Sequence, residues 1–173
     1  MAHSRLFILL EGDDDERFFN RLMKPQLLQR YDSVEVWKYA QETKKKVNSF
    51  LQSIKAMQAE YIYLTDVNGV PCATARKQKT QSKYPNLDEH GIMVAIKEIE
   101  SWYLAGMDVG SSKQLGIPHF RDTDNLTKEN FNAIIPKKFT SRVDFMQELL
   151  KYFKFEIAKR KNKSLAYFLQ KKS

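Results

Sequence analysis

Short apolar runs alternate with helical patterns over the first half of the chain, and this alternation limits the possible folds more than any other feature. The first run, Arg5 to Leu10, ends at Glu11-Gly12 and predicts a short buried strand. Apolar residues then recur at helical spacing from Phe18 to Leu28, which predicts a helix that Pro25 breaks or kinks. The chain therefore begins with a strand followed by a helix.

The same alternation continues to about residue 96. Val34 and Val36 predict a second strand, and the apolar positions between Val47 and Ile54 have the 3.6-residue period of an amphipathic helix. Tyr61 to Leu64 and Ile92 to Ile96 predict two further strands. Because strands and helices alternate, we expect an α/β fold with a mostly parallel four-stranded sheet and helices on both of its faces.

Beyond Ser101 the apolar patterns are helical only, so we expect a helical C-terminal part. The chain of 173 residues has no internal repeat, low-complexity stretch or Pro- and Gly-rich linker. We therefore expect one domain over residues 1–173, with an α/β core at about 1–105 and a helical extension at about 106–173.

Composition and apolar run lengths exclude several classes of protein. Hydrophobic residues make up 42% and charged residues 29%, which argues against a disordered chain. No apolar run has the length of a signal peptide or a membrane span. Cys72 is the only cysteine, so an internal disulfide is impossible. We expect a cytoplasmic protein that does not bind a membrane.

Acidic residues follow three of the four predicted strands. Glu11 and the acids Asp13 to Glu16 follow the first strand, Asp66 follows the third, and Glu98 and Glu100 follow the fourth. Because parallel strands end at one edge of a sheet, we expect these carboxylates to meet there. Carboxylates held so close together repel each other unless a cation neutralises them, and hard oxygen ligands suit Mg²⁺ or Mn²⁺.

Each acidic segment also has a purely structural interpretation. Asp13 to Glu16 are suited to the N-terminus of a helix, where the helix dipole favours negative charge. Asp66-Val67-Asn68-Gly69 has the composition of an ordinary turn. The occurrence of acids at three strand ends, taken together, favours the metal site.

Basic residues exceed acidic ones by eight, and the excess is clustered. A net positive surface favours binding to polyanions, above all nucleic acid, although a cluster of lysines is also a common solvated surface. The candidate nucleic-acid ligands are Arg76, Lys77, Lys79 and Lys83 in one cluster, and Lys159, Arg160, Lys161 and Lys163 in another.

Three segments, taken in order, carry a resemblance to a known family. Leu9 to Phe19 resembles the glutamate motif of TOPRIM domains, in which an apolar strand precedes Glu-Gly and an acid lies four positions after the glutamate. Tyr61 to Gly69 resembles the second TOPRIM motif, Asp-x-Asp-Gly at a strand end. Glu98 to Ala105 resembles the Glu-x-Glu-x-Trp-x-Leu-Ala signature of TOPRIM-like proteins. This group comprises small DUF4276-like proteins, whose closing segment is similar to Arg160 to Leu169, and the nuclease half of OLD-type (overcoming lysogenization defect) proteins.

The resemblance implies a nuclease that uses two divalent metal ions, about 4 Å apart, for in-line phosphoryl displacement. Glu11 and Asp15 would hold one Mg²⁺ or Mn²⁺ ion, and Glu11 could also act as a general acid or base. Asp66 and Asn68 would hold the other ion, assisted by Glu98 or Glu100. If a helix starts at these two glutamates, they cannot both point to the site, because residues two apart lie on different faces of a helix.

Asn68 is the one departure from the family pattern, because it occupies the position of the second aspartate. An amide oxygen can coordinate a metal ion but brings no negative charge. We therefore keep two alternatives to a nuclease: a nucleic-acid-binding module with a weakened TOPRIM site, and a primase-like nucleotidyl transferase. The chain has no phosphate-binding loop of an ATPase, so an ATPase partner would be a separate chain. The oligomeric state and the choice between DNA and RNA stay open, with DNA preferred.

Overall fold

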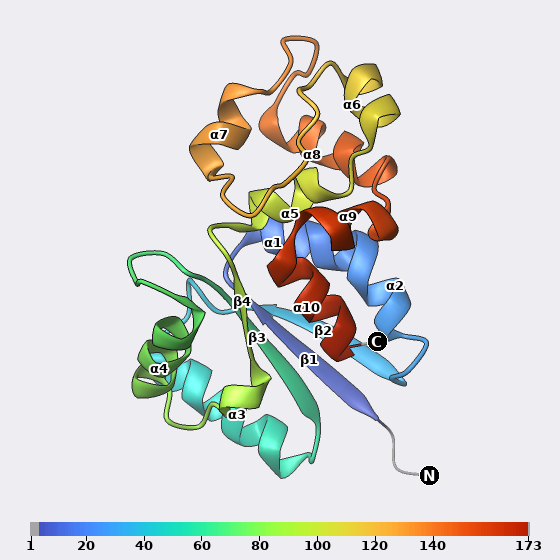
Figure 1. Ribbon diagram of the computed structural model, residues 1–173. Coiled ribbons are helices and arrows are strands. Elements are labelled where there is room, and N and C mark those ends of the chain that lie inside the picture. Colours follow the sequence, from blue (N-terminus) through green and yellow to red (C-terminus); the bar gives the residue numbers. More distant parts are fainter. Residues whose placement is uncertain (1–3, 173) are drawn as a thin grey trace. The chain divides into compact units, whose positions relative to one another are not determined.

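The computed structural model describes residues 4–172, which fall into two compact units divided between Val94 and Ala95. The first unit holds a sheet and its connecting helices (Figure 1). Its elements are β1 (Arg5–Leu10), α1 (Asp13–Phe18), η1 (Phe19–Met23), α2 (Lys24–Leu27), β2 (Ser33–Lys38), α3 (Lys44–Ala56), β3 (Glu60–Asp66), α4 (Ala73–Lys83), η2 (Glu89–Gly91) and β4 (Ile92–Ala95), of which β4 ends one residue into the second unit.

The four strands form one all-parallel sheet in the order β2-β1-β3-β4. β1 is central and pairs in parallel with both of its neighbours, so that Leu9 lies beside Trp37 of β2 and Tyr63 of β3. The fold class predicted from the alternation of strands and helices is therefore confirmed.

The strand order also determines which face each helix covers. The chain crosses from β1 to β2 in one direction and from β2 back past β1 to β3 in the other. Because such crossovers are right-handed, α1 and α2 lie on one face of the sheet and α3 lies on the opposite face. The core on the α3 face joins Phe7 and Leu9 of β1 to Val47, Leu51 and Ile54 of α3.

The helix predicted from Phe18 to Leu28 is broken, as expected, but through a π-helical turn. η1 connects α1 to α2, and Pro25 lies in the first turn of α2. Proline has no amide hydrogen, and its ring would clash with the carbonyl group four residues earlier in a regular α-helix. The wider π-helical turn next to Pro25 is one of the recognised ways in which a helix accommodates such an interruption.

The second unit is helical, which confirms the predicted helical C-terminal part. Its core contains large aromatic side chains from several helices, including the fully buried Trp102, Phe131, Phe145 and Phe168. The indole Nε1 of Trp102 donates a hydrogen bond of 2.8 Å to Ser164 Oγ, which satisfies its polar group inside this core. The helices are α5 (Ile99–Ala105), α6 (Val109–Leu115), α7 (Lys128–Ala133), α8 (Arg142–Lys151), α9 (Phe155–Lys161) and α10 (Lys163–Lys172).

Within residues 4–172, none of the helices combines the length and the apolar character that crossing a bilayer requires.

Candidate metal and phosphate site

Glu11 and Asp66 lie at the carboxyl ends of adjacent parallel strands. Glu11 directly follows β1, and Asp66 is the last residue of β3. The connections leave β1 and β3 in opposite directions, because β1 leads to β2 on one side and β3 leads to β4 on the other. Such a reversal point is where ligands bind in open parallel sheets. The expectation that these two strand ends share one edge of the sheet is confirmed.

Glu11 and Asp15 are in different local environments although only three residues separate them. Asp15 is buried, and its Oδ2 accepts a hydrogen bond of 3.0 Å from the backbone N–H of Gly12 at the start of α1. Glu11 is exposed, and its carboxylate forms no hydrogen bond or ion pair with the described residues. Glu11 therefore has its full coordination capacity, whereas part of Asp15 stabilises the helix start.

The other acids of this segment are paired with cations. Lys38 at the end of β2 donates to Asp13 Oδ1 at 2.6 Å and lies 3.0 Å from Glu16 Oε2. These two hydrogen bonds raise the pKa of Lys38. Asp14 pairs with Arg17 at 2.7 Å within α1. The structural interpretation of Asp13 to Glu16 as a helix N-terminus is thus correct, since all four acids lie in its first turn.

The loop after β3 is fixed to α4 by Arg76. Its guanidinium Nε donates a hydrogen bond of 2.9 Å to Thr65 Oγ1, and Nη1 donates one of 3.4 Å to the backbone oxygen of Asn68. Gly69 has a φ of +71°, a left-handed conformation that favours glycine. Asp66 is partly buried and Asn68 is exposed. Arg76 therefore holds the backbone that presents Asp66, and this contact was not part of the predicted role of Arg76.

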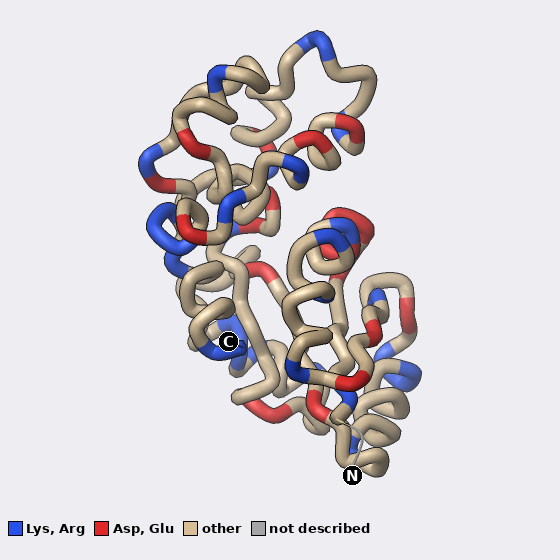
Figure 2. The backbone as a smooth tube through the Cα atoms, turned by 90° about the vertical axis from the view of Figure 1, so that its right-hand side faces the viewer, with Lys and Arg blue, Asp and Glu red and all other residues tan. Residues whose placement is uncertain are grey.

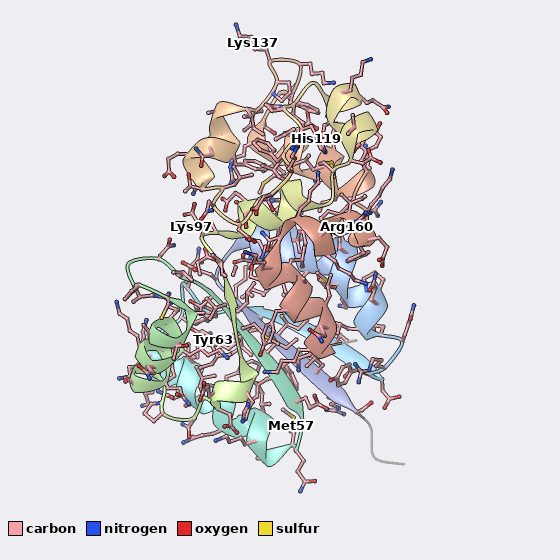
Figure 3. All side chains as sticks on the ribbon, viewed as in Figure 1. Met57, Tyr63, Lys97, His119, Lys137 and Arg160 are labelled. Carbon is pink, nitrogen blue, oxygen red and sulfur yellow. The ribbon has the colours of Figure 1, made fainter. Side chains whose placement is uncertain are left out.

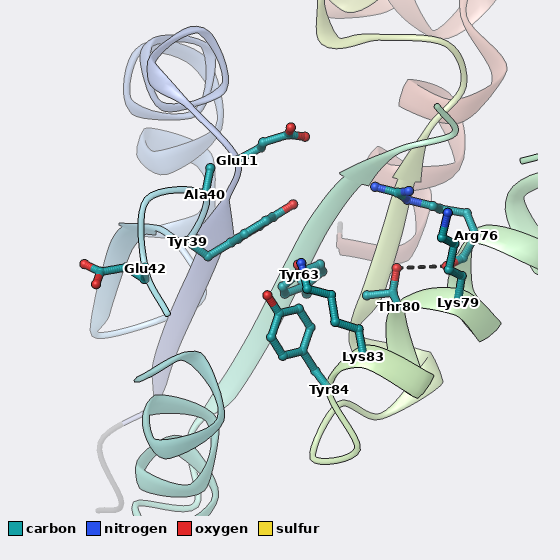
Figure 4. Close-up of a pocket in the computed structure, with 10 residues that line it drawn as sticks. All are labelled: Glu11, Tyr39, Ala40, Glu42, Tyr63, Arg76, Lys79, Thr80, Lys83 and Tyr84. Atoms are coloured by element: carbon teal, nitrogen blue, oxygen red, sulfur yellow. Dashed lines mark hydrogen bonds between the residues drawn. The ribbon is translucent and has the colours of Figure 1, made fainter. Parts of the chain in front are cut away.

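A cavity of roughly 350 Å³ lies within the first unit between the end of β1 and α4. Figure 4 shows Glu11 on one side and the basic side chains of α4 extending toward it from the other. Tyrosine rings form part of its wall. Its lining residues are Glu11, Tyr39, Ala40, Glu42, Tyr63, Arg76, Lys79, Thr80, Lys83 and Tyr84.

The sequence did not predict the role of the tyrosines in this wall. Tyr39 stacks on Tyr63 with ring centroids 4.4 Å apart, and Tyr84 lies 5.9 Å from Tyr63. Burial is the main cause that raises the pKa of both Tyr39 and Tyr63, so both hydroxyl groups stay protonated. The hydroxyl group of Tyr39 donates a hydrogen bond of 2.7 Å to the Leu64 carbonyl. Tyr63 also belongs to the core between the sheet and α3 (Figure 3).

The predicted basic cluster on α4 divides into two parts. Arg76, Lys79 and Lys83 recur at helical spacing on one face and line the cavity, whereas Lys77 does not line it. Lys and Arg positions are otherwise spread along both units (Figure 2). Proximity to Glu11 therefore distinguishes three members of this cluster from most other basic residues.

The C-terminal basic residues do not form a uniform group. Lys159 forms an ion pair of 2.9 Å with Glu156, and the exposed Arg160 donates a hydrogen bond of 3.1 Å to the backbone carbonyl of Glu156. Lys163 is exposed and lies 3.6 Å from a carboxylate oxygen of Asp124. Lys161 is different because it is buried in the second unit.

The ammonium group of Lys161 donates to the Met107 carbonyl and lies 3.2 Å from Nε2 of His119. Burial lowers the pKa of this lysine. With these contacts, Lys161 stabilises the interior of the second unit, while the other three basic residues are accessible to solvent.

Glu98 and Glu100 are both engaged within the second unit. Glu98 is the N-cap of α5, and its Oε2 accepts a hydrogen bond from the backbone N–H of Lys128. Glu100 is only 4% exposed and forms an ion pair with Arg142. Their predicted role as metal ligands stays a prediction, as does the role of every other candidate residue.

The residues at the strand ends fit a metal ion that takes only some of its ligands from the protein and the others from water and substrate. Among residues 4–172 no group of three or more His, Cys, Asp and Glu side chains is placed to hold a metal. Mg²⁺ is commonly bound by one or two carboxylates together with water and substrate phosphates. Glu11 and Asp66 at adjacent strand ends provide such a pair of carboxylates.

The order β2-β1-β3-β4 of parallel strands defines an α/β fold, and Glu11 and Asp66 lie at the reversal point of its sheet. The chain is similar in structure to the C-terminal region of the Burkholderia pseudomallei OLD protein, with a TM-score of 0.52 and 15% sequence identity. The similarity covers 99% of this chain and 98% of that chain. At this identity it shows an OLD-related fold. No protein-family model and no curated protein matches the chain, so the resemblance to the small DUF4276-like proteins stays a prediction.

Proposed function

We propose that this protein is a divalent-metal-dependent nuclease domain that hydrolyses phosphodiester bonds in nucleic acid, with DNA as the preferred substrate. The observation that carries the proposal is the position of Glu11 and Asp66 at adjacent strand ends, beside a cavity lined by three basic side chains. The OLD-related fold supports it. The helical second unit would then belong to the same functional domain.

Glu11 and Asp66 would hold a Mg²⁺ or Mn²⁺ ion together with a substrate phosphate. Such an ion supplies charge stabilisation for the attacking and leaving oxygens of a phosphoryl displacement. Asp15 and Asn68 would complete the coordination, and the resemblance to TOPRIM proteins would add a second ion and one of Glu98 and Glu100.

Three residues of α4 support this chemistry without contacting the metal. Arg76 orients the backbone around Asp66 through Thr65 and Asn68. Lys79 and Lys83 would attract and hold the phosphate backbone near Glu11, because both ammonium groups line the same cavity. The exposed Glu11 carboxylate could also accept a proton from the attacking water.

A nucleic-acid-binding module with a weakened metal site is the second candidate. Asn68 at the position of the second family aspartate favours it, as does the absence of a third clustered acid among the described residues. Binding without cleavage would then depend on the basic residues alone.

A cleavage assay separates these two functions. Plasmid and single-stranded DNA are incubated with the protein in Mg²⁺ or Mn²⁺, and the same assay is run on Glu11→Gln, Asp66→Asn and the control Glu35→Gln. Glu35 is exposed on β2 and carries the same charge as Glu11. We expect Glu11→Gln and Asp66→Asn to lose at least about 100-fold of the metal-dependent rate, since metal-held displacement contributes several kcal/mol.

Cleavage that persists in Glu11→Gln at the wild-type rate would disprove the proposed site. If the wild-type protein binds nucleic acid but does not cleave it in the presence of metal, the binding module is favoured.

A further inference from the structure

Helices α3 and α4 lie in the same unit but differ in what they turn toward the sheet. α3 buries an apolar stripe of Val47, Leu51 and Ile54, as a helix packed on a sheet normally does. α4 buries only Thr80. Arg76 and Lys83, four residues before and three residues after Thr80, are basic and line the cavity, as does Lys79 beside it. The inward face of α4 therefore does not serve to fill a core.

Two of the cations on this face have no anionic partner among residues 4–172. Arg76 is occupied by Thr65 and Asn68, but Lys79 and Lys83 form no ion pair with the described residues. The nearest interaction of Lys83 is with the ring of Tyr84, whose centroid is 5.1 Å from Nζ. The cavity thus presents two ammonium groups that are available to a ligand.

The opposite side of the cavity carries two carboxylates. Glu42 is neutralised by Lys46 at 2.7 Å, whereas Glu11 has no such partner. A negatively charged ligand would therefore be held on the α4 side and kept away from Glu11 by repulsion. Glu11 would then face the part of the ligand that follows the bound anion.

Size and charge point to one kind of ligand. The volume of roughly 350 Å³ falls within the range of about 300–1,000 Å³ that is typical of small-ligand sites. A phosphomonoester carries about −1.5 to −2 charges at neutral pH, which matches two lysines, whereas a phosphodiester carries one. The tyrosines Tyr39, Tyr63 and Tyr84 offer an apolar wall to the attached sugar.

We propose that this cavity binds the terminal phosphomonoester of a nucleic-acid strand, with Lys79 and Lys83 as its phosphate ligands. The proposal rests on the proposed function only for the identity of the ligand as nucleic acid. It gives the nuclease a preference for strand ends, because the terminal phosphate is held on α4 and the first linkages extend toward Glu11.

The test is a binding experiment without metal, so that cleavage cannot affect it. Fluorescently labelled single strands of one sequence, with a 5′-phosphate, a 3′-phosphate or hydroxyl groups at both ends, are titrated with protein in EDTA. Unlabelled inorganic phosphate and the matching nucleoside monophosphate serve as competitors. The proteins are wild type, the double variant Lys79→Met/Lys83→Met, and the control Lys55→Met, which removes an exposed lysine from α3.

We expect one of the two phosphorylated strands to bind wild type at least about tenfold more tightly than the hydroxyl strand, as an added charge-assisted contact predicts. The double variant should bind all three strands equally, while Lys55→Met keeps the preference. Unchanged melting temperatures would show that both lysine variants are folded.

Equal binding of all three strands to wild type would overturn the proposal, and so would an equal loss in Lys55→Met. A nucleoside monophosphate that binds as tightly as the phosphorylated strand would overturn the assignment to a strand end. The outcome is independent of the proposed function: cleavage without an end preference disproves only the phosphate cavity, and an end preference without cleavage disproves only the nuclease.

Discussion

Glu11 and Glu100 are both acids that follow a strand of the same sheet, yet their environments are opposite. Glu11 lies in the first unit, exposed beside the cavity and without a partner among the described residues. Glu100 lies in the second unit, buried in α5 and paired with Arg142. Arg142 itself is held by Asn132 at 2.9 Å and lies over the ring of Phe131, 5.3 Å from its centroid.

A glutamate can thus either stabilise the folded unit or remain available to a ligand. A buried carboxylate with a guanidinium partner is engaged in holding its own unit together, and its removal leaves a charge without compensation. An exposed carboxylate without a partner contributes little to folding and keeps its lone pairs for a ligand. The predictions below test whether this contrast between Glu11 and Glu100 is real.

The largest expected effect is on stability. Glu100→Ala should lower the free energy of unfolding by about 2–3 kcal/mol, somewhat less than a fully buried pair, because the Arg142 side chain is 25% exposed. Glu11→Ala should change it by less than about 0.5 kcal/mol, as is usual for exposed positions. Urea unfolding of both variants measures the difference.

A matched variant checks the cause of that loss. Arg142→Met removes the other partner, and in a double-mutant cycle with Glu100→Ala the two losses should be clearly less than additive. Equal stability of Glu11→Ala and Glu100→Ala would remove the contrast.

The second effect is stabilisation by metal. Mg²⁺ or Mn²⁺ that binds only the folded protein should add up to about 2.7 kcal/mol when its concentration is 100 times the dissociation constant. Asp66→Asn should show much less of this gain, and Glu35→Gln should show all of it. Thermal unfolding across millimolar metal is the measurement. A melting temperature of wild type that does not respond to metal would argue against a working site at the strand ends.

The smallest effect concerns Asp108, a half-buried acid of the second unit. The hydrogen bond from Lys154, followed by those from Ser111, lowers the pKa of Asp108 below its usual value of 3.8. A lowered pKa in the folded state contributes stability above pH 4, and this contribution is lost as the pH falls below that value. Asp108→Asn should therefore lose less stability than wild type between pH 5 and about pH 2.

Thermal unfolding at several acidic pH values measures this difference, with Glu35→Gln as the control that keeps the wild-type slope. An acid-induced loss that is identical in Asp108→Asn and wild type would show that the Lys154 contact does not persist in solution.

The amino-acid sequence determined the elements and their class. Short apolar runs and the 3.6-residue apolar period correctly placed all four strands and the helix from Val47 to Ile54, because buried positions are apolar. The helical character of the second unit was also predicted correctly from its apolar pattern. The acids after β1 and β3 were assigned to one sheet edge because parallel strands share a direction.

Which polar side chains are occupied by hydrogen bonds or ion pairs within the protein became visible only from the packing of the chain. The hydrogen bond of Asp15 to Gly12 is local, but the ion pair of Glu100 with Arg142 joins residues 42 positions apart. The burial of Lys161 against Met107 spans 54 positions. Such partners leave no periodic trace in a single sequence, because a charged residue looks the same whether its partner is water, a distant side chain or a ligand. The sequence therefore determined where charges lie along the chain, and the packing of distant segments decided which of them a ligand can reach.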